Sequence, residues 1–256
     1  MIFVSGSYFD AATLAHEFAE NSVQVKLLQT MTQSQIEYKY DRLDQLKFEL
    51  SLRSAIVDAS VALYRSGLRF AVFRDSFCNQ TYWTRSRDGG FLLRDGANPS
   101  EAVADIFLNG SKYGTECSTA IMILYYKALL DVYGSELFNR TFTKIYLMNW
   151  NIQEPLLKAA GSNINGGEPL LGDRQYFRNP QVNPSHSEWQ GENAIVLPNG
   201  LYYGHGTGIK TGDEIIKSLN RLRKWGATQS AYLMDIVARP DFKKLADVYH
   251  GTTSVG

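Results

Sequence analysis

An apolar run directly behind a cysteine constrains the fold of this 256-residue chain more than any other stretch. Within residues 113–133, apolar side chains recur at three- and four-residue spacing after Cys117, which predicts a buried helix that begins near this cysteine. A helix start offers free N–H groups and the positive end of the helix dipole, and both favour a thiolate. We therefore predict that Cys117 is a nucleophile activated by its position. The alternative is a cysteine that packs as a small apolar residue.

Composition excludes several classes of function. Lys+Arg and Asp+Glu number 26 each, so the formal charge is zero, and no basic stripe indicates a nucleic-acid partner. No stretch reaches the about 18 apolar residues of a membrane span, and the N-terminus lacks the pattern of a secretion signal. Cys78 and Cys117 are too few for a disulfide framework. We expect a protein kept inside the cell that makes it.

The chain reads as one domain over residues 1–256, because no Pro- or Ser-rich linker divides it. Residues 1–40 carry no chemical signature and are expected to serve packing, and residues 250–256 are expected to be a frayed tail. In the first half, the patterns predict a strand at residues 2–5, helices at 11–20, 41–66 and 98–108, a strand at 69–73, and a hairpin of 81–85 with 91–94.

The second half is expected to hold a helix at residues 135–140, a strand at 144–150, a capped helix at 211–225 and a helix at 229–237. Between them, residues 159–187 show little periodicity and are rich in loop formers. Loops on a rigid scaffold often meet the substrate, so this segment is either a rim of the site or an ordinary surface excursion.

A hairpin is predicted around Asn199-Gly200, a dipeptide that favours a two-residue turn between strands. With these two residues as the turn, Ala194 lies opposite His205, and Glu192 lies within two pairs of the histidine. A nucleophile on a helix followed by polar partners on a later sheet is the order of papain-type cysteine hydrolases. Cys117, Glu192 and His205 follow this order, and Glu116 adds a second carboxylate beside the cysteine.

Each of these residues also has a structural interpretation. His205 could be a plain loop histidine, Glu192 a solvated strand residue, and Glu116 a carboxylate favoured by the helix dipole. No Cys and His spacing indicates a metal site, and the Gly-rich segment at residues 204–208 lacks the spacing and the Lys of a phosphate loop. We expect neither metal nor cofactor.

Several motifs closely resemble the spore-coat protein-glutamine gamma-glutamyltransferases (transglutaminases) of endospore-forming bacilli. The resemblance extends from about residue 2 to residue 238; the loop at 159–167 is richer in Asn and Gly than in that family, and the tail beyond Val237 does not match. The motifs are Tyr-Gly-Thr-Glu-Cys-Ser-Thr-Ala-Ile at residues 113–121, Trp-Gln-Gly-Glu-Asn-Ala-Ile-Val-Leu at 189–197, Tyr-Gly-His-Gly-Thr-Gly-Ile at 203–209, Phe-Glu-Leu-Ser-Leu-Arg at 48–53, Gly-Ala-Thr-Gln-Ser-Ala-Tyr-Leu at 226–233, and residues 170–180.

The resemblance implies an α+β, papain-like (NlpC/P60-like) fold, in which a central antiparallel sheet packs against the helix that carries the nucleophile. It implies catalysis without calcium by Cys117 with Glu192, with Glu116 sharing that task and His205 in the site. Trp189, Asn193, Tyr202 and Tyr203 would bind substrate. The partners would be glutamine- and lysine-bearing spore-coat proteins, and the enzyme would be a monomer that acts in the mother-cell cytoplasm and then in the spore coat.

The expected reaction is an acyl transfer in which Cys117 attacks a glutamine carboxamide, ammonia leaves, and a lysine amine then attacks the thioester. Glu192 would accept the thiol proton if burial raises its pKa, and backbone N–H groups at the helix start would stabilise the oxyanion. Aromatic residues near Glu192 would keep water from the thioester. The alternatives are a papain-like hydrolase, such as a cell-wall peptidase or glutaminase, and a non-catalytic coat protein.

Overall fold

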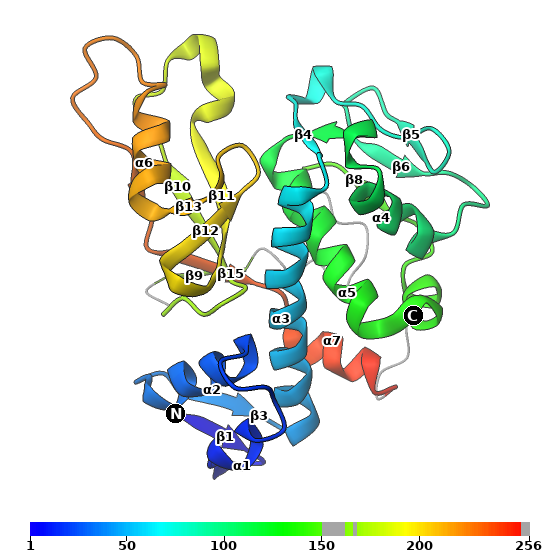
Figure 1. The fold of residues 1–256 in the computed structure, drawn as a ribbon, viewed down its shortest axis with the longest axis vertical. Helices are drawn as coiled ribbons and strands as arrows, with labels where there is room; N and C mark the ends of the chain where they lie inside the picture. Colours follow the sequence, from blue (N-terminus) through cyan, green and yellow to red (C-terminus); the bar gives the residue numbers. More distant parts are fainter. Residues whose placement is uncertain (150–161, 166–167, 252–256) are drawn as a thin grey trace.

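The computed structural model describes residues 1–149, 162–165 and 168–251, and helix α3 (Leu43–Arg65) runs through its middle (Figure 1). The helix forms because apolar residues recur on the faces it buries, among them Leu46, Ile56 and Leu63. It packs against the seven-stranded sheet on one side and against helix α5 on the other (Figure 1). The prediction of a helix at residues 41–66 is confirmed.

Helix α5 (Cys117–Thr141) begins at the predicted cysteine. Every residue from Ser118 to Tyr126 is buried, so its first turns are enclosed on all sides, which explains why this stretch is apolar all round. Gly134, with a φ of 72°, breaks the helical geometry within α5, and the predicted helix at residues 135–140 is its continuation. The main core forms where α5 meets α3 and helix α4 (Pro99–Leu108).

The largest sheet is antiparallel and curled, which confirms the predicted α+β class. Its strands run in the order β13-β12-β11-β10-β15-β9, and β14 pairs with β10 beside this path. The bounds are β9 Ser162–Asn165, β10 Arg174–Arg178, β11 Gly191–Val196, β12 Leu201–Gly204, β13 Gly208–Thr211, β14 Tyr232–Leu233 and β15 Ile236–Arg239. Helix α6 (Gly212–Asn220) covers one face, and α3 and α5 contact the sheet through β11 and its neighbours.

The hairpin of β11 and β12 differs from the prediction by one residue. Ala194 pairs with Gly204 and not with His205, because three residues, Pro198–Gly200, form the turn. The N–H of Leu197 donates to the carbonyl of Leu201 at 2.8 Å and closes this longer loop. A shift of one residue moves every side chain of a strand to the other face, so the predicted facing pairs are wrong although the hairpin is present.

Two further predictions for the sheet region are wrong. Residues 229–237 form β14 and the start of β15 instead of a helix, because pairing with β10 and β9 overrides an ambiguous local pattern. The segment 159–187, expected to lack regular structure, contains β10, whose exposed and half-buried arginines mask an alternating pattern with buried Gln175 and Phe177. Residues 159–161 and 166–167 of that segment and the end of the predicted tail, 252–256, lie outside the described residues.

The N-terminal segment packs around the lower half of α3 and forms a separate core cluster there (Figure 1). The predicted helix at 11–20 is only one turn long, because Asn21 takes a positive φ of 62° and Ser22 caps a new helix. The elements are β1 Ile2–Val4, β2 Ser7–Tyr8, α1 Ala12–Ala15, α2 Val23–Gln33 and β3 Tyr38–Tyr40.

The remaining elements are short. The predicted strand at 69–73 shrinks to two residues, and so does the described part, 144–149, of the strand predicted at 144–150. The hairpin at 81–94, the Asn98 cap of α4 and the capping box of α6 are confirmed. Helix α6 ends at Asn220, earlier than the expected residue 225. The bounds are β4 Arg69–Phe70, β5 Trp83–Arg85, β6 Phe91–Leu93, β7 Gly114–Thr115, β8 Tyr146–Leu147 and a final helix, α7, at Phe242–Tyr249.

A buried ion cluster ties α3 to the sheet at the start of β10. Arg53 of α3 donates to Glu49 and to Asp173, each at 2.8 Å, and Arg239 of β15 donates to the other Asp173 oxygen at 2.6 Å. Arg53 and Asp173 are fully buried, so both need these partners. The cluster fixes the residue that directly precedes β10.

We expect Asp173→Asn to lower the free energy of unfolding by about 3–5 kcal/mol, because two arginines would lose their shared partner. Urea unfolding followed by circular dichroism measures this loss. Asp131→Asn is the matched control, since its exposed pair with Lys127 should contribute less than about 1 kcal/mol. Equal losses in the two variants would contradict a structural role for the cluster.

Candidate active site

Cys117 is the first residue of α5, and Glu116 caps this helix. The Glu116 carboxylate accepts hydrogen bonds from the backbone N–H groups of Ser118 at 2.6 Å and Thr119 at 2.7 Å. Both carboxylate oxygens are therefore engaged at the helix start. Glu116 thus accepts from the N–H groups of Ser118 and Thr119, which were expected to be free. The N–H of Cys117 itself has no partner among the described residues.

The Cys117 thiol is not a spontaneous thiolate. Burial, followed by the negative charges of Glu192 and Glu116, raises its pKa to about 12, and hydrogen bonds from Asn193 oppose this only in part. The expectation that the helix start alone favours the thiolate is therefore wrong for this site. A neutral thiol needs a base nearby that accepts its proton.

Strand β11 brings Glu192 and Asn193 to this cysteine. The Asn193 Nδ2 donates to Cys117 Sγ at 3.5 Å. On the neighbouring strand β10, Arg174 Nη1 donates to the Asn193 Oδ1 at 2.7 Å. Asn193 lies opposite Tyr176, so Arg174 is its diagonal neighbour across the strand pair.

Glu192 is a fully buried carboxyl group. Its Oε1 accepts from the N–H of Gly206 at 3.3 Å, whereas Oε2 has no partner among the described residues. Burial raises the pKa of Glu192 to about 8; the Gly206 N–H lowers it, and the charge of Glu116 adds to the rise. A carboxyl group with this pKa exchanges protons near neutral pH, as a catalytic base must.

Glycines at 204 and 206 make room for this carboxyl group. A Cβ at Gly206 would lie 2.7 Å from the Trp189 ring and 2.8 Å from Glu192 Oε2. A Cβ at Gly204 would lie 2.7 Å from Glu192 Cγ. The Gly-rich segment therefore packs closely against the Glu192 side chain. Its sequence pattern did not predict this contact.

Both ring nitrogens of His205 have hydrogen-bond partners other than Cys117. Its Nε2 lies 3.2 Å from the Arg69 carbonyl, which can only accept, so Nε2 carries the proton. Its Nδ1, 3.2 Å from the Tyr203 hydroxyl, then accepts. Burial lowers the pKa of His205, in agreement with a neutral ring. His205 thus ties the β12–β13 turn to β4, which pairs with β7 just before Cys117.

The predicted aromatic residues separate into different places. Trp189 stacks on Phe70 of β4 with ring centroids 4.9 Å apart, and it touches the same glycine as Glu192. Tyr203 is buried in the main core below His205. The Tyr202 ring lies edge-on against Phe177 in the cluster under α6, so its described contacts are away from Cys117.

Two residues near the sulfur had no predicted role. Tyr176 and Arg174 both interact electrostatically with Cys117. Their strand lies within residues 159–187, a segment predicted to be either a rim of the site or a surface excursion with no residue named, and within the family-like residues 170–180. The alternation of buried and half-buried residues along β10 is the signal that could have identified them.

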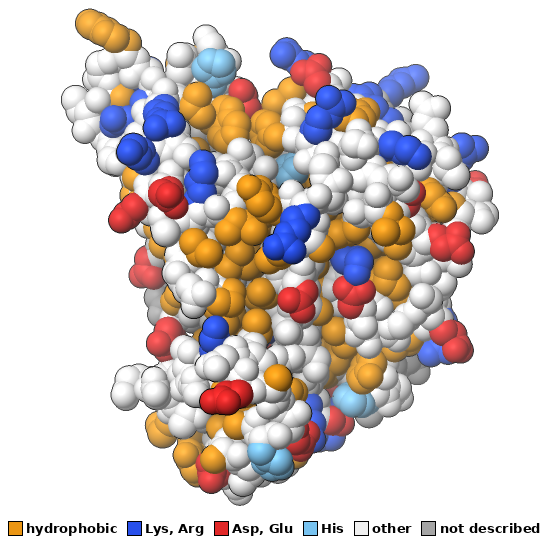
Figure 2. All heavy atoms as spheres, in the orientation of Figure 1, with side chains coloured by type: hydrophobic (Ala, Val, Ile, Leu, Met, Phe, Trp, Pro, Cys, Tyr) orange, Lys and Arg blue, Asp and Glu red, His pale blue; other side chains and the backbone are white. Residues whose placement is uncertain are grey.

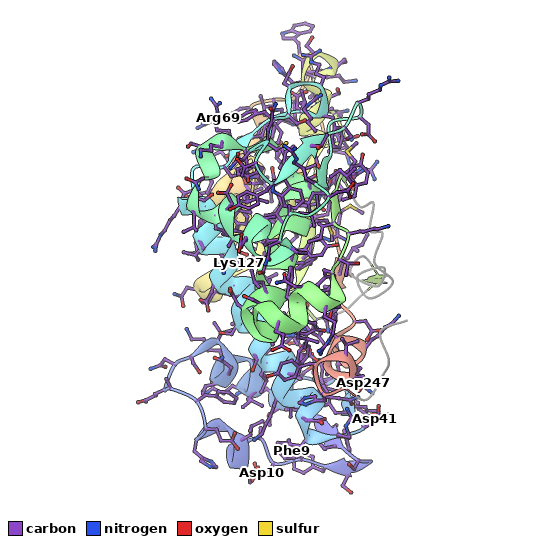
Figure 3. All side chains as sticks on the ribbon, turned by 90° about the vertical axis from the view of Figure 1, so that its right-hand side faces the viewer. Phe9, Asp10, Asp41, Arg69, Lys127 and Asp247 are labelled. Carbon is purple, nitrogen blue, oxygen red and sulfur yellow. The ribbon has the colours of Figure 1, made fainter. Side chains whose placement is uncertain are left out.

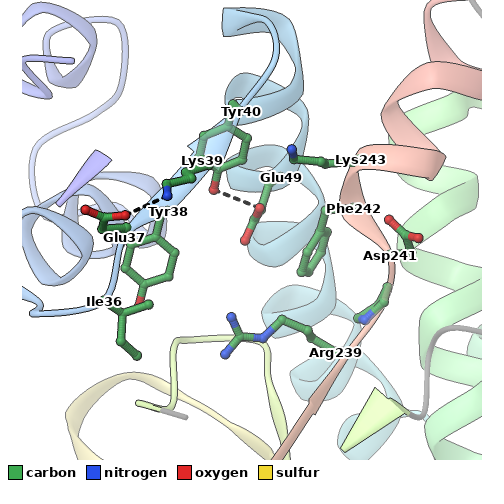
Figure 4. A pocket seen from close by; sticks show the side chains of 11 residues that line it. Ile36, Glu37, Tyr38, Lys39, Tyr40, Glu49, Arg239, Asp241, Phe242 and Lys243 are labelled. Carbon is green, nitrogen blue, oxygen red and sulfur yellow. Dashed lines mark hydrogen bonds and ion pairs between the residues drawn. The ribbon is translucent and has the colours of Figure 1, made fainter. Parts of the chain in front are cut away.

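A cavity of about 290 Å³ lies elsewhere, between residues 36–40, residues 239–243 and Glu49 (Figure 4). Lys243 beside it pairs with Asp41, and Figure 3 places Asp41 and Arg69 toward opposite ends of the long axis. Because Arg69 contacts His205, the cavity is remote from Cys117. It is not part of the candidate site.

The described ranges contain no group of three His, Cys, Asp or Glu side chains that could hold a metal ion. The helices in those ranges also include none with the length and apolarity to span a bilayer. Acidic and basic side chains are interspersed on the face shown in Figure 2.

The family model for protein-glutamine gamma-glutamyltransferase matches residues 1–249. The chain belongs to this family. It is therefore a transglutaminase, an acyltransferase that cross-links proteins through glutamine and lysine side chains, and the predicted enzyme class is confirmed.

Relatives and a solved structure agree with this assignment. The protein-glutamine gamma-glutamyltransferases of Bacillus cereus (strain B4264) and Bacillus anthracis are each 44% identical to this chain, over 228 and 229 residues. These matches cover 89% and 90% of this chain and 82% and 81% of the relatives. A transglutaminase from Geobacillus stearothermophilus, without its C-terminal extension, is 46% identical with a TM-score of 0.76, covering 81% of this chain and 98% of that one.

We expect Gly206→Ala to lower kcat/KM for amine incorporation into a glutamine-bearing protein by about 10- to 100-fold, because the new Cβ displaces Glu192 and Trp189. Gly212→Ala is the matched control. A Cβ there meets its nearest atom, on Tyr202, at 3.6 Å, and the residue begins α6, so activity should stay within about twofold. Comparable activity in the two variants would contradict the proposed support of Glu192.

Proposed function

We propose that this transglutaminase forms ε-(γ-glutamyl)lysine cross-links through a thioester on Cys117, without calcium, in a single papain-like domain spanning residues 1–256. The observation that carries the proposal is a half-buried thiol at the start of α5 together with a fully buried carboxyl group, Glu192, which has one oxygen without a partner among the described residues and whose pKa is raised to about 8. Two such groups exchange one proton, which is what an acyl transfer from a carboxamide to an amine requires.

In the first half-reaction, Glu192 takes the thiol proton while Cys117 Sγ forms a bond to the carboxamide carbon of glutamine. The tetrahedral intermediate then breaks its C–N bond, and Glu192 returns the proton so that ammonia leaves. In the second half, a lysine amine attacks the thioester carbon and passes a proton to Glu192. The C–S bond breaks, and the proton returns to the sulfur, so the enzyme ends in its starting state.

Glu192 is the stronger candidate for this base than Glu116. Both oxygens of Glu116 already accept helix N–H groups at 2.6 and 2.7 Å, whereas Glu192 has one oxygen without a partner among the described residues. The Glu116 charge raises the pKa values of both Cys117 and Glu192. We infer that Glu116 shares the task mainly by making Glu192 more basic.

The oxyanion would be stabilised by two N–H donors. One is the backbone N–H of Cys117, the first-turn donor that Glu116 does not occupy. The other is Asn193 Nδ2, which already points at Sγ, the atom next to which the oxyanion forms. Donors that are held in place before the charge develops stabilise it most. This assigns Asn193 to the glutamine carboxamide.

His205 positions the site as a neutral ring, because burial lowers its pKa. Its two hydrogen bonds connect the turn that supplies the Gly206 N–H to β4. Trp189, stacked on Phe70 across the same junction, is the residue that keeps water from the thioester. Tyr203 supports His205 from the core, and Tyr202 packs against Phe177 under α6.

The biological setting follows from the family resemblance. We infer that the substrates are spore-coat proteins and that the enzyme acts as a monomer, first in the mother-cell cytoplasm and then in the coat. The motifs at residues 113–121 and 189–197 support this assignment, because they are the segments that resemble the spore-coat enzymes.

The proposal predicts a pH profile governed by Glu192. Below a pH of about 8 the carboxyl is protonated and cannot accept the thiol proton, so kcat/KM should fall as pH falls. Hydroxylamine replaces the lysine amine as acceptor, so that ionisation of a lysine-type amine does not contribute to the profile near pH 8. A calcium chelator should leave the profile unchanged. This fall of kcat/KM toward low pH is the acidic limb of the profile. Glu192→Gln should remove the acidic limb and reduce kcat/KM by about 10²- to 10⁴-fold.

Glu116→Gln is the matched control for this experiment. It removes a charge that raises the pKa of Glu192, so the limb should persist and move to lower pH. A profile that loses its limb in Glu116→Gln and retains it in Glu192→Gln would instead identify Glu116 as the base.

Trp189→Ala should raise the ratio of glutamine deamidation to amine incorporation, because water would reach the thioester more easily. Mass spectrometry of a glutamine peptide with a limiting amine measures both products. The ratio does not depend on how much enzyme is folded. Tyr202→Ala, which removes an aromatic ring under α6, should leave the ratio unchanged. Equal ratios in the two variants would refute the role of Trp189.

A further inference from the structure

Arg174 determines which end of the Asn193 amide faces the sulfur. An amide side chain has a donor end and an acceptor end of nearly equal size, so its direction depends on its neighbours. A guanidinium can only donate, and Arg174 Nη1 lies 2.7 Å from the Asn193 side chain. The amide must therefore turn Oδ1 toward Arg174, which leaves Nδ2 directed at Cys117 Sγ at 3.5 Å.

We propose that Arg174 is a positioning residue for the transfer reaction, acting through the direction of the Asn193 amide. The inference rests on the proposed roles of Cys117 and Asn193. In the opposite orientation, the amide oxygen would face a thiolate and then an oxyanion, and both would be repelled. Arg174 removes this second orientation and so keeps a donor aimed at the reacting atoms.

The position of Arg174 suits this task. It lies on β10, at the residue next to Asp173, whose buried ion cluster fixes the chain at this point. It is partly buried, where a hydrogen bond is less exposed to competition from water than at the surface. Its planar guanidinium holds one direction better than a flexible ammonium group would.

A second explanation must be separated from this one. The positive charge of Arg174 also acts directly on the sulfur, as their electrostatic interaction shows. The other titratable groups around the sulfur are Glu116 on its own helix cap, Glu192 on β11 and Tyr176 on β10; Tyr125 of α5 adjoins Arg174. A double-mutant cycle distinguishes a relay through Asn193 from a direct effect of charge.

The experiment measures the rate at which iodoacetamide alkylates Cys117 at a fixed pH of about 8, well below the pKa of the thiol. Cys78→Ala removes the second thiol from every variant. Alkylation forms no oxyanion, so this rate reports on the thiolate alone and does not depend on transferase turnover. The variants are Arg174→Met, Asn193→Ala, the double variant and, as a control for lost charge on the same strand, Arg178→Met.

We expect Arg174→Met and Asn193→Ala each to slow alkylation about tenfold, the effect of one hydrogen bond to a charged group. In the Asn193→Ala background, Arg174→Met should change the rate by less than about twofold, because the amide that it orients is gone. Arg178→Met should leave the rate unchanged. If Arg174→Met slows alkylation tenfold both with Asn193 present and in the Asn193→Ala background, the charge acts directly and the proposal is overturned. If Arg174→Met leaves the alkylation rate unchanged in both backgrounds, the proposal is also overturned.

Asn193→Asp keeps the inference testable if Arg174→Met does not fold. The carboxylate still pairs with Arg174, so the melting temperature should be preserved, but it presents an oxygen and no donor to the sulfur. We expect alkylation at least about tenfold slower and a loss of amine incorporation of about 10²-fold or more. A rapid, wild-type alkylation rate in this variant would overturn the role of the amide direction. Loss of incorporation with normal alkylation would do so as well, while leaving the proposed oxyanion role of Asn193 intact.

Discussion

The burial of Glu192 beside Cys117 is the constraint on which the rest of the site depends. A fully buried carboxyl group favours its protonated form, and its pKa rises to about 8. Gly204 and Gly206 are required because any side chain there would collide with it. His205 and its two hydrogen bonds then hold the glycine turn that supplies the N–H for Glu192.

The site also depends on the join between the two halves of the fold. Cys117 and Glu116 come from the α5 side, while Glu192 and Asn193 come from the curled sheet. The buried pair of Arg53 and Asp173 connects α3 to the residue before Arg174, so the same contact that stabilises the fold also sets the strand that aims Asn193. Stability and positioning are therefore linked through β10.

Local patterns predicted what local forces determine. The helix start at Cys117, the Asn98 cap and the capping box of α6 depend on residues a few positions apart, and the sequence identifies them. The turn length of the β11–β12 hairpin, the existence of β10 and the strand pairing of residues 232–239 depend on distant partners, so periodicity misjudged them. The predicted hairpin supplied Glu192 as a candidate and the family resemblance supplied Asn193, but neither supplied their contacts.

The largest difference between sequence and structure concerns the charge of Cys117. A helix start favours a thiolate, yet here the Glu116 carboxylate occupies the N–H groups of Ser118 and Thr119, and its charge opposes ionisation of the sulfur. Burial acts in the same direction, so the thiol stays neutral until a base takes its proton.

A raised pKa in Glu192 also has a consequence for stability. The unfolded chain ionises this group near its ordinary pKa of 4.5, whereas the folded chain does so near 8. The folded state is therefore penalised progressively as pH rises from about 4.5 to about 8, and the penalty is constant above that range. The site can keep a basic carboxyl group at neutral pH only because the packed core of α3 and α5 offsets this loss. Chemistry at Cys117 and the stability of the fold thus oppose each other at one residue, Glu192.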